Sequence, residues 1–434
     1  RVFEEMPAAV PEALSVRRRI TLGRAVRAIA WSPAGDAVAA GDEDGTLRLV
    51  AAPSWQERWK VEHEGWVLAV AWSPVADQVA TGSSDRRLRF LDAATGALLG
   101  GLVQSDSICA VAWSPTGNVV ATGSHSDKAY LVAAPNGAVL REFVHSSVVW
   151  AVTFSPLGDQ LAIGCGDKKL RLVDTFTGQL KREVVHKGSV MAVAWSPGGG
   201  HVASASGGKD QRLRLVDALL GTECWDLQFD GAVLAVAWSP GGYRLASAGE
   251  DRKVRIVEVS SAAIIQEFAH SAELRSLSWS PLADLLGCGA GNGEVCLLEV
   301  KPGAEGRKLT AKVLPPTVPA DGEAIFQSAV NNHYMVLGVS KDAPLADIET
   351  AFRRLSKTYE TAGSVRLSEE RQRERRRQMA AIAEAHRVLA SEEQRVAYDR
   401  SLEPQAPKAT AESAVFADNA APANDVAAEA GVGS

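Results

Sequence analysis

Histidine, serine and aspartate recur together over the first 300 residues, and three such side chains form a nucleophilic triad when they meet in space. In a triad the histidine takes a proton from the serine, and the aspartate orients the histidine. Here the three residue types recur together in most units of a sequence repeat, whereas an active site would be expected at one place in the chain. We therefore interpret the recurrence as structural and expect no catalytic residues.

Two glycine-rich stretches raise the alternative of a loop that holds phosphate groups. Gly287–Gly293 and Ser206–Lys209 both lack the Lys-Ser/Thr ending of such a loop, and no helical pattern follows either one. The five cysteines are odd in number and include no Cys-x-x-Cys pair, so their spacing predicts neither a disulfide framework nor a zinc site. We expect buried thiols in a reducing compartment, with no cofactor and no bound metal. The cysteines are Cys109, Cys165, Cys224, Cys288 and Cys296.

These residues belong to a repeat of seven units. The tetrapeptide Ala-Trp-Ser-Pro, or a close variant, returns with its aromatic residue at intervals of 41, 41, 41, 41, 43 and 41 residues. In each unit an alternating apolar stretch ends at the Ser-Pro turn, where proline cannot donate to a sheet, and three more short strand patterns follow. Four strands in roughly 40–45 residues make one blade of a β-propeller. The aromatic residues are Trp31, Trp72, Trp113, Phe154, Trp195, Trp238 and Trp279.

Residues 15–300 resemble the WD40-repeat family in these seven units. The expected fold class is therefore mainly β, a seven-bladed WD40-type propeller followed by a small all-α module. The tryptophan of the Trp-Asp pair that names the family is absent from all seven units, and Val or Leu replaces it, as in Leu91-Asp92. In the family a His, a Ser/Thr, an Asp and that Trp form a tether inside the blade. The resemblance allows its His–Asp part for three pairs: His63 with Asp85, His145 with Asp167, and His186 with Asp210.

The ends of the repeat indicate how the ring closes. The last unit provides three strands by Glu299, and an unpaired strand pattern, Arg17–Leu22, precedes the first unit. We expect this segment to complete the seventh blade, so that no long strand edge stays open. Residues 1–14 are assigned to an N-terminal extension.

The resemblance also indicates where partners bind. In the family, the residues that open each innermost strand face the narrower surface of the disc, where other proteins commonly dock. Two tryptophans near a central depression, rimmed by arginines, have the composition of an interaction hot spot. The alternative is that these tryptophans lean inward and only plug the mouth of the channel. The positions are Arg27, Trp66, Leu68, Trp150, Met191, Leu234 and Arg275.

After the repeats, Lys301–Val330 is rich in Pro, Gly and polar residues and indicates a linker. A helical module is expected over residues 331–402, because apolar residues then return with helical spacing. His333–Arg400 resembles a DnaJ-type J-domain, on strings such as His333-Tyr-Met-Val-Leu-Gly-Val and Arg395-Val-Ala-Tyr-Asp. That family stimulates a DnaK-type chaperone through a His-Pro-Asp motif. This chain has Glu360, Thr361 and Ala362 there, so the resemblance implies a docking module without the usual co-chaperone activity.

An arginine-rich stretch lies inside this module, at Arg371, Arg373, Arg375, Arg376 and Arg377. Most such stretches are solvated helix faces. Because like charges one helical turn apart repel, a partner with acidic or phosphate groups is the alternative. Residues 403–434 are rich in Ala and Pro and are expected to be a disordered acidic tail.

Composition limits the remaining function classes. The 434 residues include 46 Lys+Arg and 52 Asp+Glu, a formal net charge of −6, which argues against a general binder of nucleic acid or anionic membranes. We expect no membrane span, because no apolar run reaches about 18 residues. Residue 1 is arginine and no apolar signal region follows; we expect an intracellular protein, cytoplasmic, or organellar if a targeting segment precedes it.

We predict a non-enzymatic scaffold, a subunit of a larger multiprotein complex that has protein partners and no small-molecule substrate. The alternatives are a chaperone adaptor that recruits a DnaK-type partner by an unconventional surface, and a peptide or phospho-motif reader that acts alone. Fold does not choose among them, because one fold serves many functions.

Overall fold

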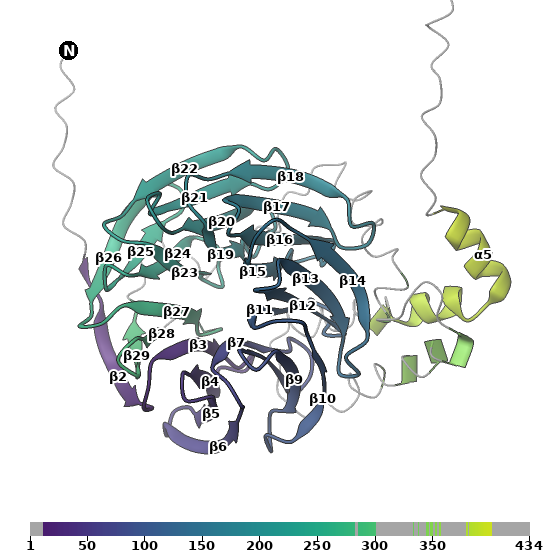
Figure 1. The fold of residues 1–434 in the computed structure, drawn as a ribbon, viewed down its shortest axis with the longest axis horizontal. Coiled ribbons are helices and arrows are strands. Elements are labelled where there is room, and N and C mark those ends of the chain that lie inside the picture. Colours follow the sequence, from purple (N-terminus) through teal and green to yellow (C-terminus); the bar gives the residue numbers. More distant parts are fainter. Residues whose placement is uncertain are drawn as a thin grey trace, which may run out of the picture. The chain divides into compact units, whose positions relative to one another are not determined.

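The computed structural model describes residues 12–282, 285–300, 333, 337, 344–346, 348, 349, 352, 353, 356, 379, 380 and 382–401. Residues 12–300 form seven antiparallel sheets around a central axis (Figure 1). Each sheet is one blade, with an inner, a second, a third and an outer strand. The prediction of a mainly β, seven-bladed propeller is confirmed.

The strands of the blades follow the chain in order. The inner strands are β3 (Val26–Trp31), β7 (Val67–Trp72), β11 (Ile108–Trp113), β15 (Val149–Phe154), β19 (Val190–Trp195), β23 (Val233–Trp238) and β27 (Leu274–Trp279). The second strands are β4 (Ala37–Asp42), β8 (Gln78–Ser83), β12 (Val119–Ser124), β16 (Gln160–Cys165), β20 (His201–Ser206), β24 (Arg244–Gly249) and β28 (Leu285–Ala290).

The third and outer strands complete each blade. The third strands are β5 (Thr46–Ala51), β9 (Arg87–Asp92), β13 (Lys128–Ala133), β17 (Lys169–Asp174), β21 (Arg212–Asp217), β25 (Lys253–Glu258) and β29 (Glu294–Glu299). The outer strands are β6 (Gln56–Glu62), β10 (Leu98–Val103), β14 (Val139–Val144), β18 (Leu180–Val185), β22 (Glu223–Gln228), β26 (Ala263–Ala269) and β2 (Ser15–Thr21).

The burial of the strands explains their sequence patterns. Second strands such as β4 and β12 are buried along their whole length, because neighbouring blades cover both faces, and they consist of short runs of small apolar residues. Outer strands such as β18 are mostly exposed and carry charged residues. The core therefore lies between blades.

In four of the seven blades the repeated tryptophan hydrogen-bonds to the blade before it, whereas the buried indole nitrogens of Trp31 and Trp195 make no such bond. The indole N–H of Trp72 donates to the carbonyl of Ala30 at 3.0 Å, across the boundary between blades one and two. Trp113, Trp238 and Trp279 donate in the same way to Ala71, Ala194 and Ala237, each at 3.0 Å. In these four blades the alanine before the aromatic residue of the preceding blade supplies the carbonyl, which satisfies the indole N–H.

The Ser-Pro turn has its own hydrogen bonds, which explain the acidic residue that follows it. The Ser32 hydroxyl donates to Asp36 at 2.8 Å and accepts from the backbone N–H of Ala37 at 3.0 Å. Ser155 and Asp159 repeat the contact at 2.6 Å. The turn therefore fixes the step from the inner strand to the second strand.

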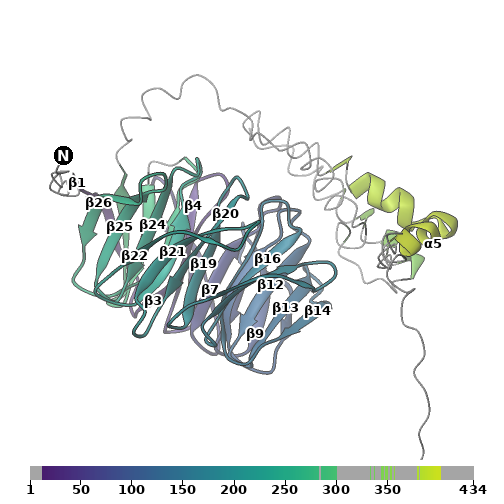
Figure 2. The same ribbon diagram turned by 90° about the horizontal axis from the view of Figure 1, so that it is seen from above.

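The ring closes through the N-terminal strand. β2 pairs antiparallel with β29, from Ser15 opposite Glu299 to Thr21 opposite Glu294, so that both ends of the propeller share blade seven (Figure 1). The prediction for Arg17–Leu22 is confirmed. A further strand, β1 (Glu12–Ala13), pairs parallel with β26 in blade six and lies beside it in Figure 2. These two residues fall within the predicted N-terminal extension, residues 1–14.

The C-terminal part is described in pieces. Residues 382–389 are helical and α5 spans Glu392–Ser401. Leu337, Ile348, Ile382 and Ala385 are buried, and the rings of Phe352 and His386 stack with centroids 3.9 Å apart. In the described part of the chain, every helix is too short or too polar to cross a membrane.

Candidate protein-binding face

A β-bulge occurs at the start of all seven inner strands. The pairing of each inner strand with its second strand skips the second residue of the inner strand, as at Arg27, between Val26 and Ala28. A bulge leaves one residue outside the ladder and redirects its side chain. The seven half-buried bulge residues, called here the ring residues, are Arg27, Leu68, Cys109, Trp150, Met191, Leu234 and Arg275.

Two neighbouring blades supply a charged sector of this ring. Arg27 in blade one pairs with Glu43 at 2.6 Å, and Arg275 in blade seven pairs with Glu273. Burial and the nearby Arg275 lower the pKa of Arg27, although Glu43 opposes the effect. The Arg27 guanidinium lies 5.0 Å from the ring centre of Trp66, a cation–π contact. Trp66, just before β7, is 45% exposed.

The other five blades supply an apolar sector. Trp150 meets His125 edge to face, with ring centroids 5.1 Å apart. A Cβ on Gly207 would lie 3.0 Å from Met191 Cγ, so the glycine leaves room for the methionine. Burial, with Asp106 nearby, raises the pKa of Cys109 to about 12, so this thiol is neutral. The ring is therefore asymmetric, with ion pairs on blades seven and one and apolar side chains on blades two to six.

The residues predicted for the narrow face come together in this ring. Six of them are ring residues, and the seventh, Trp66, lies beside Arg27. Cys109 was missed, although it stands four residues before Trp113, in the register used for the other six. Binding through this face stays a prediction.

The three predicted His–Asp pairs have a different geometry from the expected tether. His63 Nε2 hydrogen-bonds with the Thr81 hydroxyl at 3.0 Å, and His186 Nε2 lies 3.3 Å from the Ser204 hydroxyl. His145 Nδ1 accepts from Arg171 at 3.4 Å. The His186 Nδ1 atom lies 3.8 Å from the Asp210 carboxylate, beyond hydrogen-bond distance.

An arginine, rather than the histidine, is the close partner of each of these aspartates. Arg89 donates to Asp85 at 2.7 Å and Arg171 to Asp167 at 2.6 Å, while Arg214 lies 3.4 Å from Asp210. Burial alone would raise the pKa of Asp167, but hydrogen bonds from Arg171 and Ser146 bring it to about 2. The histidines stay neutral, because burial and the arginines lower the pKa of each to about 4.

These ion pairs are a repeated device that the sequence analysis missed. Arg255 likewise pairs with Asp251 at 2.5 Å, and its Nε contacts Glu267 of the outer strand at 3.1 Å. The arginine is the third residue of the third strand, four residues after the aspartate, and this Asp-x-x-x-Arg spacing was the signal.

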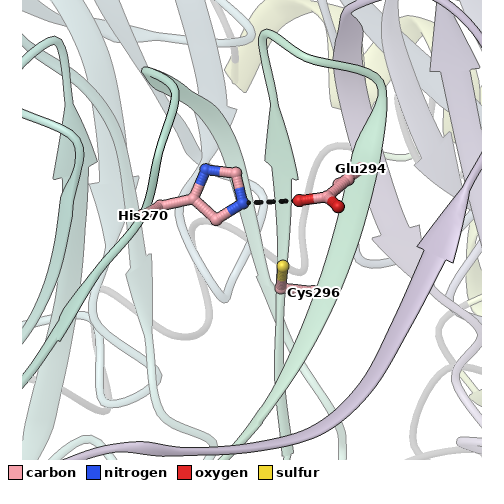
Figure 3. A group of neighbouring side chains, drawn as sticks. All are labelled: His270, Glu294 and Cys296. Carbon is pink, nitrogen blue, oxygen red and sulfur yellow. Dashed lines mark hydrogen bonds and ion pairs between the residues drawn. The ribbon is translucent and has the colours of Figure 1, made fainter.

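Blade seven carries a different cluster (Figure 3). His270 Nε2 lies 2.9 Å from Glu294 Oε2, and the Cys296 thiol completes a group whose ligand atoms all lie within 4.8 Å of one another. The hydrogen bond with the Cys288 thiol lowers the pKa of Cys296 to about 7, against the effect of burial. In the part of the chain that the structure describes, this is the one group of at least three such residues with metal-ligand spacing.

The remaining predicted residues lie outside the described residues. They are Glu360, Thr361, Ala362, Arg371, Arg373, Arg375, Arg376 and Arg377.

Family models match both parts of the chain. The WD domain, G-beta repeat model matches residues 98–131, 137–174, 178–217 and 225–258, and the Anaphase-promoting complex subunit 4 WD40 domain model matches residues 29–113. The DnaJ domain model matches residues 332–399. Chaperone protein DnaJ of Hydrogenobacter thermophilus is 40% identical over 73 residues, which are 17% of this chain and 19% of that protein. The chain thus spans about a fifth of that relative's length. These matches and the seven blades show WD40 repeats in a seven-bladed β-propeller and a C-terminal segment that matches the DnaJ domain.

Proposed function

We propose that this protein is a non-enzymatic scaffold, a subunit of a larger assembly that binds other proteins through the ring residues and Trp66. WD40 propellers in general bind proteins, and the seven bulges support a binding role for this face, because each removes a residue from the ladder and redirects it. The observation that carries the proposal is the 45% exposed Trp66 stacked on Arg27, since tryptophan and arginine dominate interaction hot spots.

The ring also indicates the chemistry of the partner. An apolar side chain fits the sector of Leu68, Trp150 and Met191. A carboxylate on the partner would compete with Glu43 or Glu273 for the guanidinium groups. We therefore expect a protein segment that carries an apolar anchor next to an acidic residue.

The test is capture of partners from the protein's own cells. The variant Trp66→Ala with Trp150→Ala is compared with Leu180→Ala with Leu219→Ala, which removes two exposed leucines, 53% and 69% accessible, from the outer part of the blades. Loss of one hot-spot side chain costs about 2 kcal/mol or more, about 30-fold in affinity, so the first variant, which loses two, should bind about 30-fold to 1000-fold more weakly. If it keeps every partner at wild-type yield with an unchanged Tm, the ring is not the binding face.

The second candidate is a chaperone adaptor, supported by the DnaJ domain match. We favour a docking role for this segment, because Glu360, Thr361 and Ala362 replace the His-Pro-Asp motif of the family. Single-turnover ATP hydrolysis by a DnaK-type chaperone, measured with the full chain, separates the two. The triple variant Glu360→His, Thr361→Pro and Ala362→Asp is the matched control. Stimulation by the wild-type chain would establish the adaptor instead.

The arginine-rich stretch 371–377 supports a narrower proposal, contact with an acidic or phosphate-bearing surface of a partner protein. The proposal predicts that partner retention by the wild-type chain falls steeply as the salt concentration rises. After the five arginines are changed to glutamine, retention should no longer depend on salt in this way. If the chain binds short phosphopeptides but purifies without stably associated proteins, the result would favour the alternative of a phospho-motif reader that acts alone.

A further inference from the structure

Blade seven departs from the other blades at three aligned positions. The third residue of the third strand is arginine in five blades, Tyr130 in blade three, and Cys296 in blade seven. The first residue of that strand is a cation in blades two to six and Glu294 in blade seven. The fourth residue of the second strand hydrogen-bonds with the histidine or glutamine of the blade at Thr81, Thr122 and Ser204, and is Cys288 in blade seven. Each replacement is a stronger ligand for a transition metal than the residue it replaces.

The fold brings these side chains to one place from three segments. Cys288 on β28 stands directly opposite Cys296 on β29, and the Cys288 thiol donates to the Cys296 carbonyl at 3.5 Å. Glu294 lies two residues before Cys296, on the same face of β29. His270 follows β26 of blade six and reaches Glu294 at 2.9 Å. Figure 3 shows the imidazole, the carboxylate and the Cys296 sulfur converging.

The cluster is shielded from water. The side chain of His270 is 0% exposed, both thiols are 0% exposed, and only Glu294, at 22%, reaches the surface. A metal ion would therefore enter past Glu294 and lose its hydration shell inside. Structural zinc sites of four protein ligands have this closed character.

The charge of the site also suits a divalent cation. Two thiolates, one carboxylate and a neutral imidazole around Zn²⁺ carry a net charge of −1. Arg19 on β2 stands opposite Cys296 and lies 3.4 Å from Glu294, so a cation is in place to balance it. Asn292 also donates to Glu294, at 3.1 Å, which orients the carboxylate.

We propose that His270, Cys288, Glu294 and Cys296 form a zinc site that joins blades six and seven beside the closing strand β2. Tetrahedral Zn²⁺ needs distances of about 2.3 Å to sulfur and about 2.0–2.2 Å to nitrogen or oxygen, so donor atoms must lie roughly 3.3–3.8 Å apart. The donor atoms of His270, Glu294 and Cys296 all lie within 4.8 Å of one another and reach this spacing by side-chain shifts of about 1 Å or slightly more. The Cys288 thiol lies outside this group and must turn away from the Cys296 carbonyl to join it. Binding replaces two thiol protons with the metal, and these protons go to solvent. The sequence analysis expected no metal, because the four ligands have no zinc-motif spacing along the chain.

The test uses the tag-free full-length chain, purified with a reductant and a chelator and then titrated with Co²⁺ and Zn²⁺ alone. We expect thiolate-to-Co²⁺ charge-transfer absorption that saturates at one ion per chain and is displaced by Zn²⁺, and a Tm that rises with zinc. Cys296→Ser and His270→Gln should each weaken binding at least about tenfold. Cys224→Ser removes an exposed thiol elsewhere and should leave the titration unchanged.

Three results would overturn the proposal. The first is no thiolate absorption from the reduced wild-type chain, a measurement that depends on no variant. The second is wild-type metal affinity in a folded Cys296→Ser chain, which would place the ion elsewhere. The third is a chain that carries a Cys288–Cys296 disulfide as isolated and takes up no metal after reduction, in which case the thiols are a redox pair.

Discussion

Two buried histidines should make the propeller sensitive to mild acid. His63 and His186 are nearly inaccessible, and burial, with a neighbouring arginine, lowers the pKa of each from 6.5 to about 4. Between about pH 6.5 and 4 the unfolded chain therefore binds a proton at each position that the folded chain does not. The stability of the folded state is then lost as the pH falls through this window.

The chain itself offers the substitution that isolates this effect. Just after the outer strand of blade two, Gln104 occupies the histidine position and donates to the Thr122 hydroxyl of blade three at 2.7 Å, as the histidines contact Thr81 and Ser204. The double variant His63→Gln with His186→Gln should therefore keep both hydrogen bonds and lose both titrations.

The size of the effect follows from the two pKa values. At pH 5 a histidine with a pKa of 6.5 unfolded and about 4 folded destabilises the protein by about 2 kcal/mol relative to pH 7.5. Two histidines give about 4 kcal/mol. With an unfolding entropy of about 2.1 cal/mol/K per residue over roughly 290 propeller residues, this corresponds to a Tm difference of about 7 °C.

The assay is the Tm of wild type and variants from pH 5 to pH 7.5. The double glutamine variant should match wild type within about 2 °C at pH 7.5 and exceed it by about 7 °C at pH 5. Gln104→His is the reciprocal control and should lower the Tm at pH 5 by about 3 °C relative to wild type. Parallel pH dependences for the wild type and both variants would refute the reasoning, because they would show that other groups cause the acid sensitivity.

Further substitutions test the rest of the structure. Asp210→Asn removes the buried carboxylate 3.4 Å from Arg214 and leaves that arginine only the exposed Glu223, 3.3 Å away, as an acidic partner. It should cost about 3 kcal/mol, a Tm loss of about 5 °C, whereas Arg17→Ala at an exposed ion pair should cost under about 1 kcal/mol in the same melts. Trp72→Phe removes the hydrogen bond to Ala30 and should cost about 1–3 kcal/mol by thermal unfolding; an unchanged Tm would show that packing alone holds the blades together. Deletion of residues 1–21 removes β2 and exposes the edge of β29, so size-exclusion chromatography should show aggregates; a stable monomer would mean that the ring needs no closing strand.

The fold could be predicted because its signals are local and repeated. In every blade an apolar run such as the one before Trp72, followed by a Ser-Pro turn, marks the end of the inner strand. The segment Arg17–Leu22 was identified as the closing strand because the seventh unit lacks a fourth strand of its own. β1 could not be predicted, because two residues give no periodicity. What holds it is tertiary: the backbone N–H of Leu14, just after it, donates to Glu267, and the Leu14 side chain is buried between blades six and seven.

The site was predictable only in part. The register that identified Trp150 and Arg275 also identifies Cys109, but sequence gave no sign of the bulge that redirects all seven side chains. The Asp–Arg ion pairs were not predicted, because in the family pattern the aspartate pairs with a histidine instead. The blade-seven cluster joins His270 to Glu294 and Cys296 across 24 and 26 positions, and only the register of β28 with β29 brings Cys288 to the same place.

The central claim is that this chain works as a fixed subunit of a larger assembly. The most direct test is the native mass and composition of the tagged protein, purified from its own cells at low and at moderate salt. The account predicts one large species of constant stoichiometry at both salt concentrations, which is lost when Trp66 and Trp150 are changed to alanine. A free chain with substoichiometric partners that leave at moderate salt would contradict it.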